Sequence, residues 1–87
     1  MTGAPKIKAM ELCTQLEKQE RGIYSGALGY FYGDGVVDLS VVIRTLIIQD
    51  KKYEFQVGGG IVSESNPEQE LAEIFDKGKG LKSVLFL

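Results

Sequence analysis

The chain has 87 residues, of which 44% are hydrophobic and 25% are charged, and its net charge is −2 at pH 7. These values are typical of a single small globular domain over residues 1–87 and exclude a disordered segment. The balance of charge gives no reason to expect nucleic acid or an acidic membrane as a partner. Because the sequence has no histidine, it cannot form a Ser-His-Asp triad, a Cys-His pair or a histidine-rich metal site.

The single cysteine, the lack of a long apolar run and the motif at the first residue lead to two further expectations. Cys13 is the only cysteine, so no intrachain disulfide can form, and we expect a cytoplasmic protein. No apolar run reaches the roughly 20 residues of a membrane span, and no signal peptide pattern is present. A turn-and-helix motif begins at Met1 without any lead-in, so we expect the chain to be a fragment of a longer protein.

The first predicted element is a helix over residues 6–20. Pro5 suits the first turn, because its missing N–H would have no partner there. Gly22 is a natural stop after the polar end of this segment. The apolar positions that recur at helical spacing are Ile7, Met10, Cys13 and Leu16.

Three antiparallel strands are predicted next, over residues 23–32, 36–49 and 52–57. Gly33-Asp34-Gly35 and Asp50-Lys51 supply the two hairpin turns. The long middle strand carries apolar residues on both faces, so we expect it to be largely covered.

A second helix is predicted from Pro67 to about Leu81, with Asn66 as its cap and Leu71, Ile74, Phe75 and Gly78 facing inward. The predicted fold is therefore α+β: a helix, a three-stranded antiparallel sheet and a helix.

Arg44 is the first candidate for binding an anion. A guanidinium on a covered strand needs an anionic partner, and its fork matches a carboxylate in two parallel hydrogen bonds. The alternatives are a structural ion pair with Asp38 or Glu54, or an edge strand that leaves Arg44 in water. The residue types alone leave these alternatives open.

The glycine run Gly58, Gly59 and Gly60 is the second candidate. Glycine allows positive φ and leaves no side chain between the backbone and a ligand, so the run can form an anion-binding nest. A flexible connector is the alternative. The spacing matches neither dinucleotide- nor mononucleotide-binding glycine loops. Tyr24 can donate its hydroxyl to an anion, or it can pack in the core with an exposed tip.

Glu70, Glu73 and Lys77 form the third candidate, because their spacing sets them on one stripe of the last helix. Two carboxylates on neighbouring turns can share Mg²⁺, with Lys77 close enough to neutralise the assembly or reach a substrate. The alternative is an ordinary surface ion pair between Glu73 and Lys77.

Five segments, in order along the chain, resemble the C-terminal part of the chorismate-binding enzymes. That family includes anthranilate synthase, aminodeoxychorismate synthase, and isochorismate and salicylate synthases. The segments are Thr2–Glu11, Arg21–Tyr30, Asp38–Thr45, Gly58–Val62 with Ser65 and Pro67, and Glu70-x-x-Glu73-x-x-x-Lys77. The resemblance implies that the chain is a C-terminal piece of the larger chorismate-utilising fold.

The resemblance also implies roles for the candidates. Residues matching Tyr24 and Arg44 contact the substrate carboxylate, and the loop matching Gly58, Gly59 and Gly60 supplies backbone N–H groups. Residues matching Glu70 and Glu73 belong to a Mg²⁺ site, and the lysine matching Lys77 lies close to it, which makes Lys77 the candidate catalytic residue.

Among the branches of this family, the Val57–Val62 loop and the Ser40–Thr45 strand look most like aminodeoxychorismate synthase component I. That enzyme converts chorismate and ammonia to aminodeoxychorismate for folate synthesis, with ammonia from a glutamine amidotransferase partner. An anthranilate, isochorismate or salicylate synthase fragment is the alternative within the family. A non-catalytic α+β ligand-binding or oligomerisation module is the alternative of another class.

Upstream elements of the family's catalytic domain have no counterpart in this chain. We therefore expect it to be inactive alone. We also expect it to self-associate through an exposed apolar face and unpaired strand edges.

Overall fold

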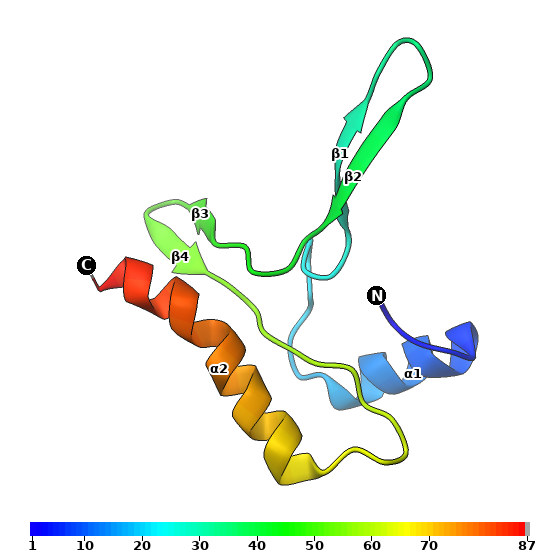
Figure 1. Ribbon diagram of the computed structural model, residues 1–87, viewed down its shortest axis with the longest axis vertical. Helices are drawn as coiled ribbons and strands as arrows, with labels where there is room; N and C mark the ends of the chain where they lie inside the picture. The colour runs from blue at the N-terminus through cyan, green and yellow to red at the C-terminus, as the bar shows by residue number, and fades with distance from the viewer. Residues whose placement is uncertain (87) are drawn as a thin grey trace. The chain divides into compact units, whose positions relative to one another are not determined.

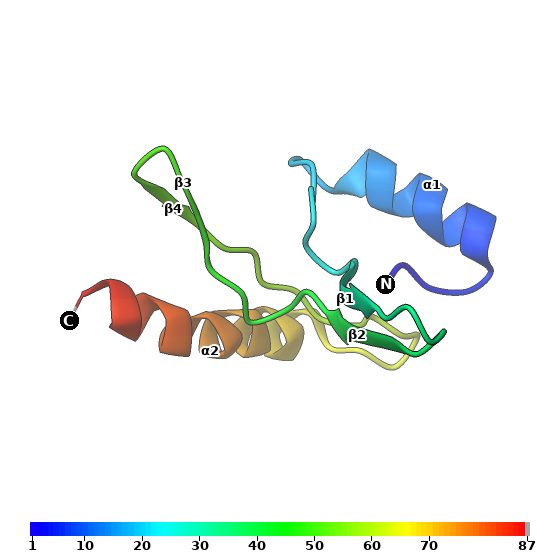
Figure 2. The same ribbon diagram turned by 90° about the horizontal axis from the view of Figure 1, so that it is seen from above.

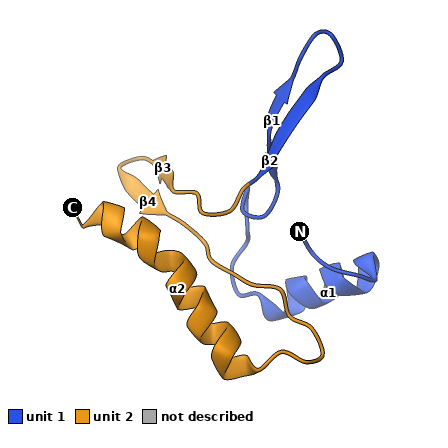
Figure 3. Ribbon diagram, viewed as in Figure 1, with its two compact units in different colours: residues 1–41 blue, residues 42–87 orange. Residues whose placement is uncertain are grey.

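The computed structural model describes residues 1–86, which divide between Val41 and Val42 into two compact units (Figure 3). The first unit contains helix α1 (Lys6–Leu16) and strands β1 (Ala27–Phe31) and β2 (Val37–Val41) (Figure 1). The second contains strands β3 (Ile47–Gln49) and β4 (Lys52–Glu54) and helix α2 (Pro67–Leu85). The predicted α+β class is confirmed.

Helix α1 is shorter than the predicted span of 6–20. It ends at Leu16, because Glu17 takes extended backbone angles of φ −80° and ψ 127°. Pro5, which the sequence predicts in the first turn, stands one residue earlier, at the N-cap, with an extended ψ of 143°. Residues 21–26 then form tight turns, in which Ser25 has a left-handed φ of 61°. These turns delay the first strand, which begins at Ala27 instead of residue 23.

The β1–β2 hairpin confirms the first predicted turn. Its strands are antiparallel and in register from Ala27 opposite Val41 to Phe31 opposite Val37. At the turn, the N–H of Val36 donates a hydrogen bond to Oδ1 of Asp34 at 3.0 Å. Aspartate side chains commonly stabilise turns by accepting from the backbone N–H two residues later. Gly35 takes a positive φ of 88°, which glycine adopts without steric cost.

The prediction of one long strand over residues 36–49 is wrong. The chain leaves the extended conformation between β2 and β3, where Arg44 has a φ of 51°. A left-handed residue cannot continue a strand, and Thr45 fixes the bend with a hydrogen bond from Oγ1 to the carbonyl of Ile43. The predicted three-stranded sheet is therefore two separate two-stranded sheets, β1–β2 and β3–β4.

The second hairpin confirms the predicted turn at Asp50 and Lys51. Both residues have positive φ, 51° and 62°, which is the conformation of the tight turn that suits a two-residue hairpin. After β4 the chain runs alongside α2 and then reverses into it (Figures 1 and 2).

Helix α2 begins where the sequence predicts. Asn66 is its N-cap and accepts a hydrogen bond from the N–H of Gln69 at 3.1 Å, and Pro67 is the first helical residue. The helix continues to Leu85, beyond the predicted end at Leu81.

Few side chains of the described residues are buried. Val42 and Ser25 are 6% and 8% exposed, and Gly78 is the buried residue of α2. Leu71 and Phe75, which we expected to face inward, remain 55% and 62% exposed. Among residues 1–86, neither helix packs on the hairpin of its own unit. The apolar side chains that the sequence predicts on one side of each helix are therefore not covered by that hairpin.

Candidate functional site

Helix α2 carries the three charged candidates along one side. The side-chain pair that the spacing predicts is present, since Nζ of Lys77 lies 2.5 Å from Oε1 of Glu73. The ammonium also donates a hydrogen bond to the carbonyl oxygen of Gly58 at 3.2 Å. Lys77 therefore joins the helix to the glycine run, which an ordinary surface pair does not do.

Gly59 lies against the same charged side chains. A Cβ built on Gly59 would be 3.4 Å from Oε2 of Glu70 and 3.4 Å from Nζ of Lys77, and a Cβ on Gly60 would meet nothing within 4 Å. The backbone of the glycine run is thus held close to a carboxylate and an ammonium. Gly59 and Gly60 do not take the positive φ that the prediction of a nest invoked, so what glycine contributes at these two residues is open space beside the backbone.

The structure brings together most of the candidates from the second unit: the glycine run, Glu70, Glu73 and Lys77. Residues 57 and 58 are half-buried, while Gly59 and Gly60 are exposed. A ligand can therefore reach the backbone of the last two glycines, beside the charged side chains.

Arg44 differs from its prediction. It lies on an exposed bend and not on a covered strand face, and it forms no ion pair with the described residues of its own unit, so the pair with Glu54 is absent. Asp38 belongs to the other unit, and the pair with it stays a prediction. Apolar residues on both faces of a segment do not make it one continuous strand, because a single left-handed residue can bend it. Its guanidinium is available to an anion from solvent.

A cluster around Arg21 was not predicted. Its guanidinium donates to Oε2 of Glu17 and to Oγ of Ser25, each at 2.7 Å, and to the carbonyl of Met1 at 2.6 Å. The hydrogen bond from Arg21 lowers the pKa of Glu17, and the same bond raises the pKa of Arg21. The i, i+4 spacing of Glu17 and Arg21 was the available signal. The cluster holds the N-terminus, the end of α1 and the following turn together.

Comparison with known families decides the identity of these segments. A family model described as chorismate binding enzyme matches residues 1–83. The chain belongs to the chorismate-binding enzyme family.

Individual relatives within this family carry two names. An aminodeoxychorismate synthase from Streptomyces pristinaespiralis is 47% identical over 85 residues, which are 98% of this chain and 12% of that protein. An anthranilate synthase component 1 from Lactococcus lactis is 44% identical over 84 residues, or 97% of this chain and 18% of the relative. The corresponding enzyme of Cereibacter sphaeroides is 40% identical over 82 residues, or 94% and 16%. The chain spans less than a fifth of the length of these relatives.

The Mg²⁺ that the resemblance to chorismate-binding enzymes implies can be tested against the donors present. Mg²⁺ prefers carboxylate oxygens, takes one or two of them from a protein, and keeps waters or substrate oxygens as its other ligands. Glu70 and Glu73 supply two carboxylates one turn apart beside the glycine run, so the donor set fits. Residues 1–86 contain no group of three acidic, cysteine or histidine side chains that could hold a metal by themselves.

Tyr24 belongs to the first unit of the chain. It is half-buried, and its backbone N–H donates to the carbonyl of Arg21 at 3.1 Å within the turns that precede β1. Its predicted contact with a carboxylate stays a prediction.

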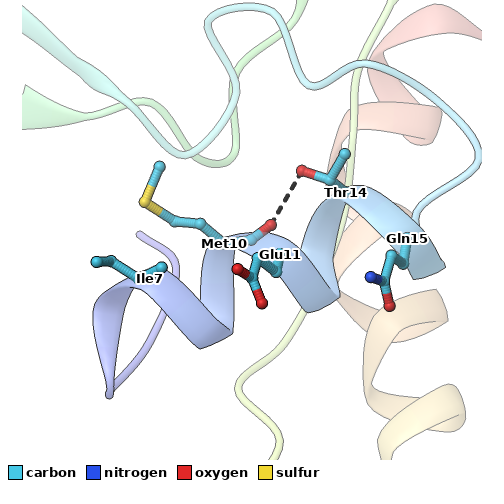
Figure 4. A pocket seen from close by; sticks show the side chains of 5 residues that line it. All are labelled: Ile7, Met10, Glu11, Thr14 and Gln15. Atoms are coloured by element: carbon cyan, nitrogen blue, oxygen red, sulfur yellow. Dashed lines mark hydrogen bonds between the residues drawn. The ribbon is translucent and has the colours of Figure 1, made fainter.

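A hollow on α1 lies outside the predicted site. It has a volume of about 420 Å³ and is open to solvent along one side of the helix (Figure 4). Its lining residues are Ile7, Met10, Glu11, Thr14 and Gln15. A groove that a single helix lines has no convergent polar groups from a second element, so it does not resemble a substrate site.

In the described part of the chain, no helix is long and apolar enough to cross a membrane.

Proposed function

We propose that the chain forms part of the catalytic domain of an aminodeoxychorismate synthase component I. In this proposal the complete enzyme replaces the C4 hydroxyl of chorismate with an amino group from ammonia, releases water and keeps the enolpyruvyl side chain. A partner amidotransferase supplies the ammonia from glutamine. The observation that carries the proposal is the cluster of Gly58, Gly59, Glu70, Glu73 and Lys77, in a chain that matches the chorismate-binding family.

The exposed glycines account for part of the substrate recognition. Chorismate is a dianion, and backbone N–H groups without side chains in front of them can bond its carboxylate oxygens. Gly60 has open space where a side chain would be, which leaves room for a planar carboxylate. These amides are therefore the proposed anion cradle.

Arg44 supplies the cationic part of the proposed recognition. Its left-handed φ of 51° is unusual for a residue other than glycine, and such strained backbone is concentrated at binding and catalytic positions. The bend presents a guanidinium that forms no ion pair with the described residues of its unit, and such a group suits a bidentate contact with a carboxylate. From the family resemblance, Tyr24 is proposed to donate its hydroxyl to a substrate carboxylate.

Glu70 and Glu73 are the proposed ligands of Mg²⁺. When bound, Mg²⁺ would withdraw charge from the ring carboxylate of chorismate and favour departure of the C4 hydroxyl. Glu70 lies near the glycine run, since a Cβ on Gly59 would be 3.4 Å from its Oε2 atom, so the proposed metal ligand stands beside the proposed anion cradle.

The preference for the aminodeoxychorismate branch is supported by the Gly-Gly-Gly loop and by the relative at 47% identity. Anthranilate synthase component I is the second candidate, because relatives with that name match at 40% and 44% identity. That enzyme eliminates pyruvate, and the residues of the cluster suit both reactions, since both begin with a bound dianion.

A pair of chimeras tests the proposal. The matching segment of the Streptomyces pristinaespiralis enzyme, and separately that of the Lactococcus lactis enzyme, is replaced by this chain. Chorismate, ammonia and Mg²⁺ are then supplied, and products are separated by chromatography with mass detection. We expect the aminodeoxychorismate chimera to retain activity within about tenfold of its parent, the anthranilate chimera to retain less, and the 87-residue chain alone to form no product.

Two glutamates of the same helix provide the matched comparison. Glu70→Gln should lower kcat/KM of the active chimera by about a hundredfold, whereas Glu68→Gln, on an exposed residue of the first turn, should leave it unchanged. If both chimeras fold but consume no chorismate, the proposed function is wrong. If only the anthranilate chimera is active, the proposed branch is wrong.

A further inference from the structure

We propose that Lys77 is a positioning residue, which holds the glycine run against α2 and does not act on the reacting atoms. The tether itself depends only on contacts within residues 42–86, and its effect on substrate binding rests on the proposed function. This role differs from the catalytic role that the family resemblance suggested for Lys77.

The contacts of the ammonium support this role. Nζ of Lys77 bonds the carbonyl of Gly58 at 3.2 Å and the carboxylate of Glu73 at 2.5 Å. An ammonium has three donors, so two of them are engaged by groups of the same unit. The Lys77 side chain is 24% exposed, which means that it lies along the protein and does not extend into solvent.

A second lysine on the same helix shows that these contacts are specific. Lys79 also pairs with an acidic residue one turn earlier, with Nζ 2.5 Å from Oδ1 of Asp76. Its side chain is 75% exposed and bonds no other segment of the described chain. Lys79 is thus the matched control, since it has the same charge and the same kind of ion pair but no tether.

The neighbouring residue gives the tether an apolar counterpart. A Cβ on Gly78 would be 3.5 Å from both Phe55 and Val57, so the segment before the glycine run lies directly on the helix at this residue. The backbone is held at Phe55 and Val57 by packing and at Gly58 by Lys77. Gly59 and Gly60 follow this last fixed point, and glycine has more conformational freedom to lose than any other residue. Their position therefore depends on the tether.

The first experiment measures backbone order without any ligand. ¹⁵N relaxation of the 87-residue chain gives order parameters for Gly58, Gly59 and Gly60. We expect about 0.85 in the unsubstituted chain and less than about 0.6 in Lys77→Met. Lys79→Met should leave the values unchanged, and Lys77→Arg should restore most of the order, because a guanidinium can also donate to a carbonyl. Unchanged order in Lys77→Met would overturn the proposal.

The second experiment separates positioning from chemistry in the active chimera. Lys77→Met should raise KM for chorismate by about tenfold and change kcat by less than about threefold. A fall in kcat of a hundredfold or more with KM unchanged would assign Lys77 to the chemical step and refute the positioning role. If the chimera is inactive but the order parameters fall as expected, the proposed function fails and the tether stands.

Discussion

The ammonium of Lys77 and the carbonyl oxygen of Gly58 lie 3.2 Å apart, although 19 residues separate them in the sequence. This hydrogen bond makes the glycine run and α2 one structural piece. The next residue of the helix, Gly78, is buried, and a Cβ there would lie 3.5 Å from side-chain carbons of Phe55 and Val57. The candidate site therefore depends on how closely the segment before the glycines packs on α2.

Gly78→Ala tests that packing. The new Cβ would lie 3.5 Å from side-chain carbons of Phe55 and Val57, which is ordinary van der Waals contact. Alanine also favours a helix over glycine by about 1 kcal/mol. We expect the free energy of unfolding, from urea denaturation followed by circular dichroism, to rise by about 1 kcal/mol.

Gly80→Ala is the control for this substitution, because a Cβ there meets nothing within 4 Å. It gains the same helix propensity without the contact. Gly78→Ala should be at least as stable as Gly80→Ala. A Gly78→Ala variant that is less stable than the unsubstituted chain would mean that the segment packs more tightly than the described contacts allow.

Substitution of Arg44 tests whether its backbone is strained. In the left-handed conformation a Cβ approaches the following carbonyl, at a cost of about 1–2 kcal/mol. The free energy of unfolding of Arg44→Gly should therefore be about 1 kcal/mol higher than that of Arg44→Ala. Both variants lose the guanidinium, but only Arg44→Ala keeps a Cβ. Both should lower kcat/KM in the chimera. Equal stabilities would show that residue 44 is not left-handed in solution.

Gly29 allows the β1–β2 register to be tested. A Cβ at this position would lie 1.9 Å from the carbonyl oxygen of Asp38, so any side chain requires the strands to separate. We expect Gly29→Ala to abolish the cross-strand nuclear Overhauser effects between residues 29 and 39. Gly33→Ala, in the turn and facing open space, should keep them. Retention of the same register in Gly29→Ala would contradict the described pairing.

The ion pair of Glu17 and Arg21 predicts a dependence on pH. The hydrogen bond from Arg21 lowers the pKa of Glu17 in the folded state. The stabilisation is therefore complete above the unfolded-state pKa, about 4.3, and is lost as pH falls through the lower folded-state pKa. Because Glu17 is 39% exposed, the effect should be small and weakened by salt.

A carboxyl titration by ¹³C NMR checks this prediction. The midpoint for Glu17 should lie below that of an unpaired glutamate, and Arg21→Gln should raise it. A midpoint that is the same with and without the guanidinium would show that the pair does not form in solution.

The local features that the sequence predicted best are those set by neighbouring residues. Asn66 and Pro67 determine the start of α2, and the glycine and aspartate turns determine both hairpins. Each depends on hydrogen bonds or backbone angles within a few residues. The same holds for the pair of Glu73 and Lys77, whose spacing places them on adjacent turns.

The features that the sequence did not predict depend on distant contacts or on single backbone angles. Residues 36–49 have the composition of a strand throughout, yet one left-handed residue at Arg44 divides them. The hydrogen bond from Lys77 to Gly58 joins residues 19 positions apart, and that separation in the sequence does not indicate a contact. The exposure of Leu71 and Phe75 reflects the lack of a covering layer within the unit, which periodicity cannot reveal.

A crystal structure of the active chimera with chorismate and Mg²⁺ tests most directly whether the glycine run, Arg44 and the two glutamates belong to one anion site. We predict a substrate carboxylate within about 3 Å of the backbone nitrogens of Gly59 and Gly60 and of the Arg44 guanidinium, with Mg²⁺ on Glu70 and Glu73. Chorismate bound beyond hydrogen-bonding distance of both the glycine amides and Arg44 would contradict the account.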